Sequence, residues 1–231
     1  MSENQDKNIF LKLVSIFWEP SACFEALKVK INWVDIVIPL LVVIIAGMFA
    51  SSYITPIAVK ERITRIENSE RLPDEQKEIM IERMENQANS PMNYVGIIII
   101  NVVKLAVVAA VILFIANFLF GGELKYMTLL AVTAYINLVD LVNTAVKTPM
   151  IVSQETIKVY TSIALFLDES SSYFFRLMSQ IDIFTVWKVI LFSIATAVLL
   201  NKKATKTALP IAAVWLLYAL GTATLAGLAN F

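Results

Sequence analysis

The chain has 231 residues, of which 58% are hydrophobic and only 16% are charged. Soluble domains average about 45–50% apolar and about 25% charged residues, so this composition excludes an ordinary soluble domain and indicates a helical membrane protein. The 19 basic residues balance 19 acidic ones, which leaves no positive surplus for binding nucleic acid. The sequence has no histidine and one cysteine, Cys23, so it lacks the commonest general base and any Cys-rich metal site. We therefore expect no catalytic, cofactor-binding or metal site.

Residues 1–33 precede the first long apolar stretch and carry apolar side chains at helical spacing. Ile9, Leu13 and Ile16 recur on one face, and a second such piece follows Pro20. This pattern predicts amphipathic helices, which lie in the membrane interface, pack on the other helices, or do both.

Five stretches are long and apolar enough to cross a bilayer, whose core about 30 Å thick needs roughly 20 apolar residues per helix. They lie at residues 34–54, 94–120, 127–146, 183–200 and 209–228. The predicted fold class is therefore all-α, a polytopic membrane protein with a five-transmembrane-helix bundle in a single membrane domain.

Two long loops join the spans, at residues 57–93 and 147–182. We expect Pro56 to end the first span. The first loop is rich in charges at helical spacing, and Pro73 suits the first turn of a helix. This loop is predicted to form an extramembrane helical hairpin, acting either as a solvated cap or as an arm that docks a partner.

The distribution of lysines predicts the orientation. The N-terminal segment carries four lysines, and the short loop between the fourth and fifth spans carries Lys202, Lys203 and Lys206 without an acidic residue. Cytoplasmic flanks are enriched in lysine and arginine. The N-terminus is therefore predicted to be cytoplasmic and the C-terminus outside, in a bacterial cytoplasmic membrane.

Three charged residues lie well inside the predicted spans: Lys104 in the second, Asp140 in the third and Lys188 in the fourth. A charge within the bilayer costs ~2.5–3.5 kcal/mol on insertion scales, so each needs a partner or water. Counted at about 1.5 Å per residue from the ends of their spans, the three fall in one layer in the outer half of the membrane.

Polar neighbours extend this layer. Asn101 shares a helical face with Lys104, and Asn137 shares one with Asp140. We hypothesise a polar cluster of Lys104, Asp140, Asn101 and Asn137, with Lys188 as the second cation. It is either an ion pair that fixes helix register or part of a cavity that binds an ion, a lipid headgroup or a solute. A third possibility is that the lysines extend outward without pairing.

Three sequence segments together resemble the Yip1 family, whose members have five transmembrane helices. The segments are Phe17-Trp18-Glu19-Pro20 with Phe24 and Leu27, then Gly121 to Tyr126 running into Ala134-Tyr135, and Ile181 to Trp187 followed after a span by Lys202-Lys203-Ala204. The family tends to place a proline shortly after the tyrosine of the third span, whereas here Ile136–Asp140 follows. The missing proline implies a straighter third helix.

The resemblance is to the compact bacterial branch and brings no catalytic residues with it. Eukaryotic relatives are associated with Rab GTPases and vesicle traffic, a role that does not transfer to bacteria. The resemblance implies a non-enzymatic membrane scaffold, or an accessory subunit of a membrane complex such as a transporter. Its partners would be the lipid bilayer and other membrane proteins, or a second copy of itself. The alternative is a small transporter, channel or lipid-handling protein that uses the Lys/Asp layer.

Overall fold

A computed structural model describes residues 8–70, 72–88, 90–170 and 172–228. These residues form helices and contain no strand, apart from an isolated antiparallel bridge between Ser162 and Asp182. In chain order the helices are α1 (Ile9–Trp18), α2 (Pro20–Val29), α3 (Val34–Glu67), α4 (Asp74–Ala88), α5 (Met92–Phe114), the π-helical turn η1 (Ile115–Leu119), α6 (Tyr126–Ile136), α7 (Val139–Gln154), the 3-10 turn η2 (Ile163–Phe166), α8 (Tyr173–Gln180), α9 (Ile183–Leu200) and α10 (Ala204–Leu228).

Five of these helical segments are long and apolar enough to span a membrane, as the sequence predicts. They are α3, α5 with η1, α6 with α7, α9 and α10. Their outward faces remain apolar, as on α5, where Ile98, Ile99 and Ile100 are exposed. Such faces suit contact with lipid tails, because the bilayer provides no water that would penalise exposed apolar groups.

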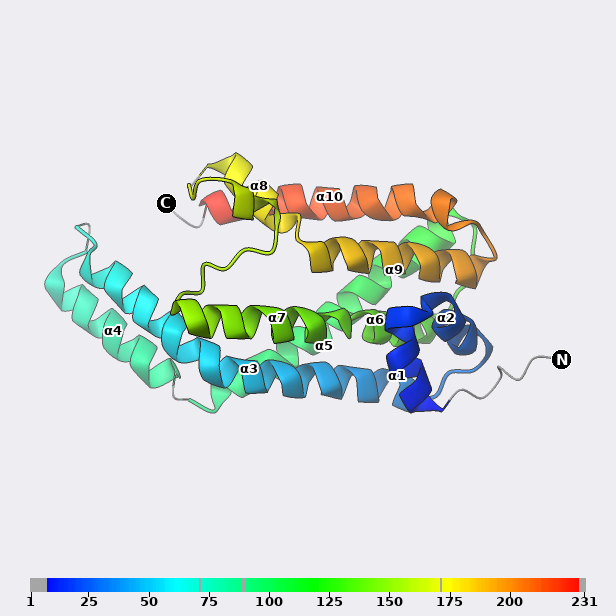
Figure 1. The fold of residues 1–231 in the computed structure, drawn as a ribbon, viewed down its shortest axis with the longest axis horizontal. Helices are drawn as coiled ribbons and strands as arrows, with labels where there is room; N and C mark the ends of the chain where they lie inside the picture. Colours follow the sequence, from blue (N-terminus) through cyan, green and yellow to red (C-terminus); the bar gives the residue numbers. More distant parts are fainter. Residues whose placement is uncertain (1–7, 71, 89, 171, 229–231) are drawn as a thin grey trace.

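The first span is longer than predicted, because α3 continues through Pro56 to Glu67. The expectation that Pro56 ends this helix is wrong: a proline removes one backbone hydrogen bond and bends a helix, but it does not have to terminate it. The extension of α3 pairs with α4 to form the predicted hairpin, where the Lys77 amine donates to the Glu67 carbonyl at 3.0 Å. Figure 1 shows this hairpin, hereafter the α3–α4 arm, extending beyond one end of the bundle.

The third span also exceeds its predicted end at residue 146, because α7 continues to Gln154. The rest of the second long loop, from residue 155 to 182, contains only η2 and α8 as regular structure. Its apolar run at 159–167 forms no helix long enough to span a membrane. This segment lies at the same end of the bundle as the α3–α4 arm (Figure 1).

The opposite end of the bundle carries α1, α2, the turn before α6 and the turn between α9 and α10 (Figure 1). The turn before α6 uses Gly121 at a φ of +63°, which favours glycine. The side chain of Asn117 holds this turn by bonding both the N–H and the carbonyl of Leu124, at 2.9 and 3.1 Å. The glycine pair therefore lies in a tight turn that leads from η1 into α6.

The N-terminal helices pack against the bundle on one face and leave the other face open. Phe24 and Leu27 of α2 are fully buried in the core, which is centred on α6 and α9, whereas Phe10 and Trp18 of α1 are exposed. Exposed aromatic residues at a bundle end are typical of the membrane interface. The packing of this segment on the bundle is therefore confirmed, and its placement in the membrane interface stays a prediction.

Candidate functional site

The third span is interrupted near its middle, between the end of α6 at Ile136 and the start of α7 at Val139. The Asp140 N–H donates to the Asn137 carbonyl at 2.9 Å, which closes a tight turn. Asn137 and Leu138 keep right-handed helical dihedral angles, so α6 and α7 continue as one span. The straighter third helix implied by the missing proline stays a prediction. Asparagine is a weak helix former that favours turns, so it can interrupt a helix without a proline. The break places Asp140 in the first turn of α7, where the helix dipole favours a carboxylate.

Asp140 lies between the two intramembrane lysines. The Lys188 amine from α9 is 2.5 Å from its Oδ1, and the Lys104 amine from α5 is 3.4 Å from its Oδ2. The Lys188 side chain is 15% exposed, against 47% for Lys104. The structure thus brings these three residues together into one group, hereafter the triad, in which Lys188 makes the closer and more buried pair.

The triad carries an excess of one positive charge, because two ammonium groups share one carboxylate. In the described part of the chain, Asp140 is the one carboxylate within salt-bridge distance of either lysine. A lysine ammonium has three donors, so neither amine is fully used by a single carboxylate oxygen. This arrangement favours an additional anionic or hydrogen-bond-accepting group beside Lys104, the more exposed amine.

The two asparagines of the predicted cluster do not join the triad through described side-chain bonds. The Asn101 amide donates to the Ile97 carbonyl of its own helix at 2.9 Å. The described bonds of Asn137 are made by its backbone, which donates to the Thr133 carbonyl and accepts from Asp140. Asn137 therefore belongs to the helix break that positions Asp140.

A groove of about 380 Å³ begins at the triad and lies between α5, α9 and α10. Lys104 and Lys188 belong to its lining, and most of the remaining lining is aliphatic or aromatic, including Ile115, Phe192 and Trp215. Ligand pockets commonly combine an apolar wall with a few placed polar groups. The groove therefore suits a molecule with a long apolar part and a polar or anionic end.

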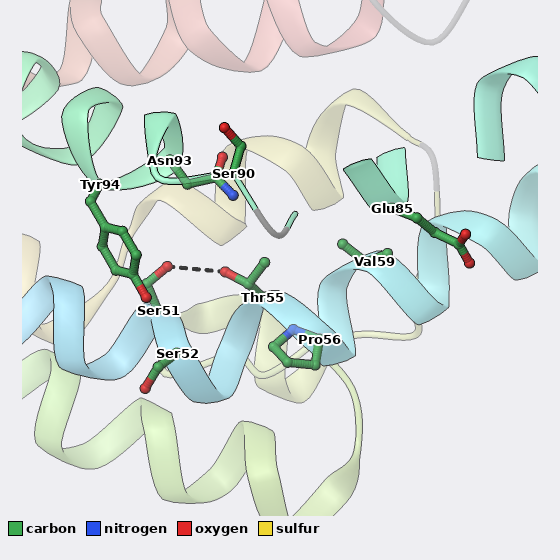
Figure 2. Close-up of a pocket in the computed structure, with 9 residues that line it drawn as sticks. All are labelled: Ser51, Ser52, Thr55, Pro56, Val59, Glu85, Ser90, Asn93 and Tyr94. Atoms are coloured by element: carbon green, nitrogen blue, oxygen red, sulfur yellow. Dashed lines mark hydrogen bonds between the residues drawn. The ribbon is translucent and has the colours of Figure 1, made fainter. Parts of the chain in front are cut away.

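A second pocket, of about 500 Å³, lies between α3 and the start of α5 near the α3–α4 arm. Figure 2 shows the Ser51 and Thr55 hydroxyls, which are 3.0 Å apart, with Asn93 and Tyr94 from α5 near them. Glu85 is the charged side chain among the described lining residues. This pocket offers hydrogen bonds at one end of the bundle but has no pair of like charges comparable to the triad.

A second buried polar network was not predicted as a site. Lys12 of α1 forms an ion pair with Asp35 at the start of α3, and the Tyr135 hydroxyl donates to the same carboxylate at 3.2 Å. Asp35 is 2% exposed and Tyr135 is fully buried. The network joins the N-terminal helix to the first and third spans.

A partial signal for this network is visible in the sequence. Asp35 stands at the edge of an apolar span, and a carboxylate there needs a partner. Lys12 is one of the four N-terminal lysines from which the orientation is predicted, whereas the structure buries it in an ion pair. The two residues lie 23 positions apart on separate helices, so no helical periodicity connects them.

A third network holds the start of α9. The Asp182 side chain caps this helix by accepting from the Phe184 N–H at 2.9 Å, and it also accepts from Lys147 at 2.9 Å and from Thr161. Burial raises the pKa of the Asp182 carboxyl, but these hydrogen bonds outweigh that effect and hold its pKa below the usual range. Asp182 thus ties the long loop to the bundle.

The fold and these networks define an all-helical integral membrane protein with five spans and a charged triad within them. Among the described residues, no group of three or more histidine, cysteine, aspartate or glutamate side chains could hold a metal ion. The Yip1 domain matches the chain from residue 14 to residue 226, which covers all five spans. The chain therefore belongs to the Yip1 domain family. No curated protein and no solved structure matches it.

Proposed function

We propose that the protein is a non-enzymatic integral membrane scaffold or accessory subunit, which holds another membrane protein through the α3–α4 arm. The observation that carries this proposal is the outer face of α4. Ile79 is 45% exposed there, although it lies among the exposed Glu75, Glu78 and Glu82. These four residues share one helical face by their spacing.

The chemistry of this face indicates the kind of partner. α4 carries five acidic and two basic residues, so its surface is negative. A single exposed isoleucine framed by glutamates resembles the arrangement of interfaces, in which an apolar anchor is surrounded by a polar rim. The partner is therefore a membrane protein that presents a basic extramembrane segment with an apolar anchor.

Charge reversal on the arm tests this proposal. The tagged protein, Glu78→Lys and Glu123→Lys would be purified from native membranes after mild cross-linking. Glu123 is an exposed glutamate before α6, at the other end of the bundle, so it provides the matched control. A defined membrane partner should be recovered with the parent and with Glu123→Lys but lost with Glu78→Lys. Equal recovery with both variants, or recovery of this chain alone, contradicts the proposal.

The non-enzymatic part of the proposal is supported by the sequence and the family. The chain has no histidine. Asp140 pairs with two lysines, and the triad contains no second carboxylate. It therefore lacks the paired acids that are typical of hydrolytic sites. These features favour a structural or binding role for the charges within the bundle.

The second candidate is a small transporter, channel or lipid-handling protein that uses the triad. It is favoured by the opening of both lysines onto the apolar groove. Reconstitution in liposomes tests it directly. Flux or lipid movement that Asp140→Asn abolishes supports this candidate, and the same basal leak with and without protein contradicts it.

We further propose a bacterial cytoplasmic membrane location with the N-terminus inside. Labelling of single introduced cysteines by a membrane-impermeant maleimide tests the orientation, since the natural Cys23 is fully buried. Arg62→Cys on the α3 part of the arm, which is exposed and away from the α4 face, should react in intact cells, whereas Lys203→Cys should react only after lysis. The opposite labelling pattern would mean that the N-terminus lies outside.

A further inference from the structure

We propose that the groove between α5, α9 and α10 binds one acyl chain of an anionic phospholipid, whose phosphate contacts Lys104 and Lys188. This site lies among the spans, away from the α4 face that carries the scaffold proposal. The failure of one proposal therefore leaves the other intact.

The charge of the triad selects an anion. Asp140 supplies one negative charge, and its two oxygens are each directed to a different lysine. The closer pair with Lys188 largely satisfies this carboxylate. Lys104, at 3.4 Å and with 47% of its side chain exposed, keeps donor capacity facing the groove. An uncompensated ammonium inside the bilayer is costly, and an anionic headgroup removes that cost.

The length of the groove matches an acyl chain in one leaflet. Along α5 and the start of η1 its lining extends from Lys104 to Ile115. Eleven residues of α-helix rise about 16 Å. One leaflet contributes half of a core that is about 30 Å thick. The groove is therefore long enough for a chain that starts at the lysines and runs toward the opposite end of the bundle.

The position of the lysines requires the phosphate to lie below the membrane surface, in the outer half of the bundle, where both amines meet Asp140. Lys188 lies five residues after the start of α9 at Ile183. This places it roughly 7–8 Å along the helix from that end. The start of α9 lies toward the end of the bundle that carries α8 (Figure 1), so the lipid comes from the leaflet on that side.

The groove is open sideways to the bilayer. Val107 and Tyr218, which line it on α5 and α10, are 56% and 65% exposed. A phospholipid can therefore enter sideways from beneath the headgroup layer of the surrounding bilayer, with its phosphate drawn in to the lysines. A solute from water would have to cross that headgroup layer, which favours a membrane lipid over a soluble anion.

The test measures which lipid remains bound to the full chain. The purified protein would be equilibrated with mixed phosphatidylglycerol and phosphatidylcholine vesicles, extracted with mild detergent and examined by native mass spectrometry. We expect one retained phosphatidylglycerol per chain. Lys104→Met should reduce its retention roughly tenfold, as the loss of one charge-assisted hydrogen bond implies. Lys104→Arg should restore retention.

Two matched tryptophan substitutions on α5 test the groove separately from the charges. Val107 and Val103 are both exposed on α5, at 56% and 54%, but only Val107 lines the groove. Val107→Trp should therefore prevent retention while Val103→Trp leaves it unchanged. Because both substitutions are at exposed positions, the folded state should tolerate them equally.

The direction in which lipid retention changes in one further variant distinguishes anion binding from a purely structural triad. Asp140→Asn removes the carboxylate that competes for the lysines, so phosphatidylglycerol retention should be equal or higher in the protein that remains folded. Equal retention of phosphatidylcholine and phosphatidylglycerol overturns the proposal. Equal retention in Val107→Trp and Val103→Trp, or a free fatty acid retained in place of the phospholipid, also overturns it.

Discussion

The triad makes an ordered prediction about stability, because its three members differ in pairing and exposure. Asp140→Leu leaves two lysines without a carboxylate, Lys188→Met leaves the longer pair, and Lys104→Met leaves the shorter one. We expect the loss of unfolding free energy to be greatest for Asp140→Leu and smallest for Lys104→Met.

The magnitudes follow from burial. Breaking a buried ion pair by removing one partner costs about 3–5 kcal/mol, and Asp140→Leu should fall near the lower value because Lys104 is half-exposed. Lys104→Met should cost less than about 1 kcal/mol, as for an exposed pair. Replacing all three residues by apolar ones should recover most of the loss, since an apolar core of similar volume is often as stable as a buried ion pair.

Unfolding of the purified variants by denaturing detergent, followed by circular dichroism, measures these differences. A double-mutant cycle between Asp140 and Lys188 isolates the coupling of the closer pair. If Lys104→Met costs as much as Asp140→Leu, or if Asp140→Leu is neutral, the assignment of the charge balance is wrong.

Three further outcomes are expected. Asp35→Asn should destabilise the fold by about 3 kcal/mol, because it leaves a buried lysine unpaired. Tyr135→Phe, which removes one hydrogen bond to Asp35, should cost about 1 kcal/mol. Equal effects of the two variants on thermal unfolding would contradict this order. The pKa of Asp182 is lower in the folded state than the unfolded value of about 4. Its stabilising contribution is therefore present above the unfolded pKa and is lost as pH falls through the folded pKa. The free energy of unfolding should consequently depend less on acid pH in Asp182→Asn. Gly122→Ala should cost about 1–3 kcal/mol, because an added Cβ would lie 2.9 Å from a backbone carbonyl, and unchanged thermal stability would refute that packing.

The five spans and the charged layer could be predicted because they depend on local composition and on helix geometry. Apolar length identifies a span, and the rise per residue places Lys104, Asp140 and Lys188 at similar depths. Their contacts then follow from the cost of leaving such charges unpaired.

Other features depend on tertiary context and could not be predicted in this way. The break before Asp140 occurs at Asn137 without a proline, and α3 continues through Pro56 although a proline usually ends or bends a helix. The burial of Lys12 requires α1 to pack beside the start of α3, which no helical period within α1 can indicate.

Site-specific cross-linking is the sharpest test of whether the α3–α4 arm holds a membrane partner, as we propose. A photoreactive amino acid at Ile79 should give one discrete adduct with a membrane protein in living cells. The same probe at Val103, on a span face exposed to lipid, provides the control. We expect a protein adduct at Ile79 that Glu78→Lys removes. Adducts with lipid alone, or the same protein adduct from both positions, would contradict it.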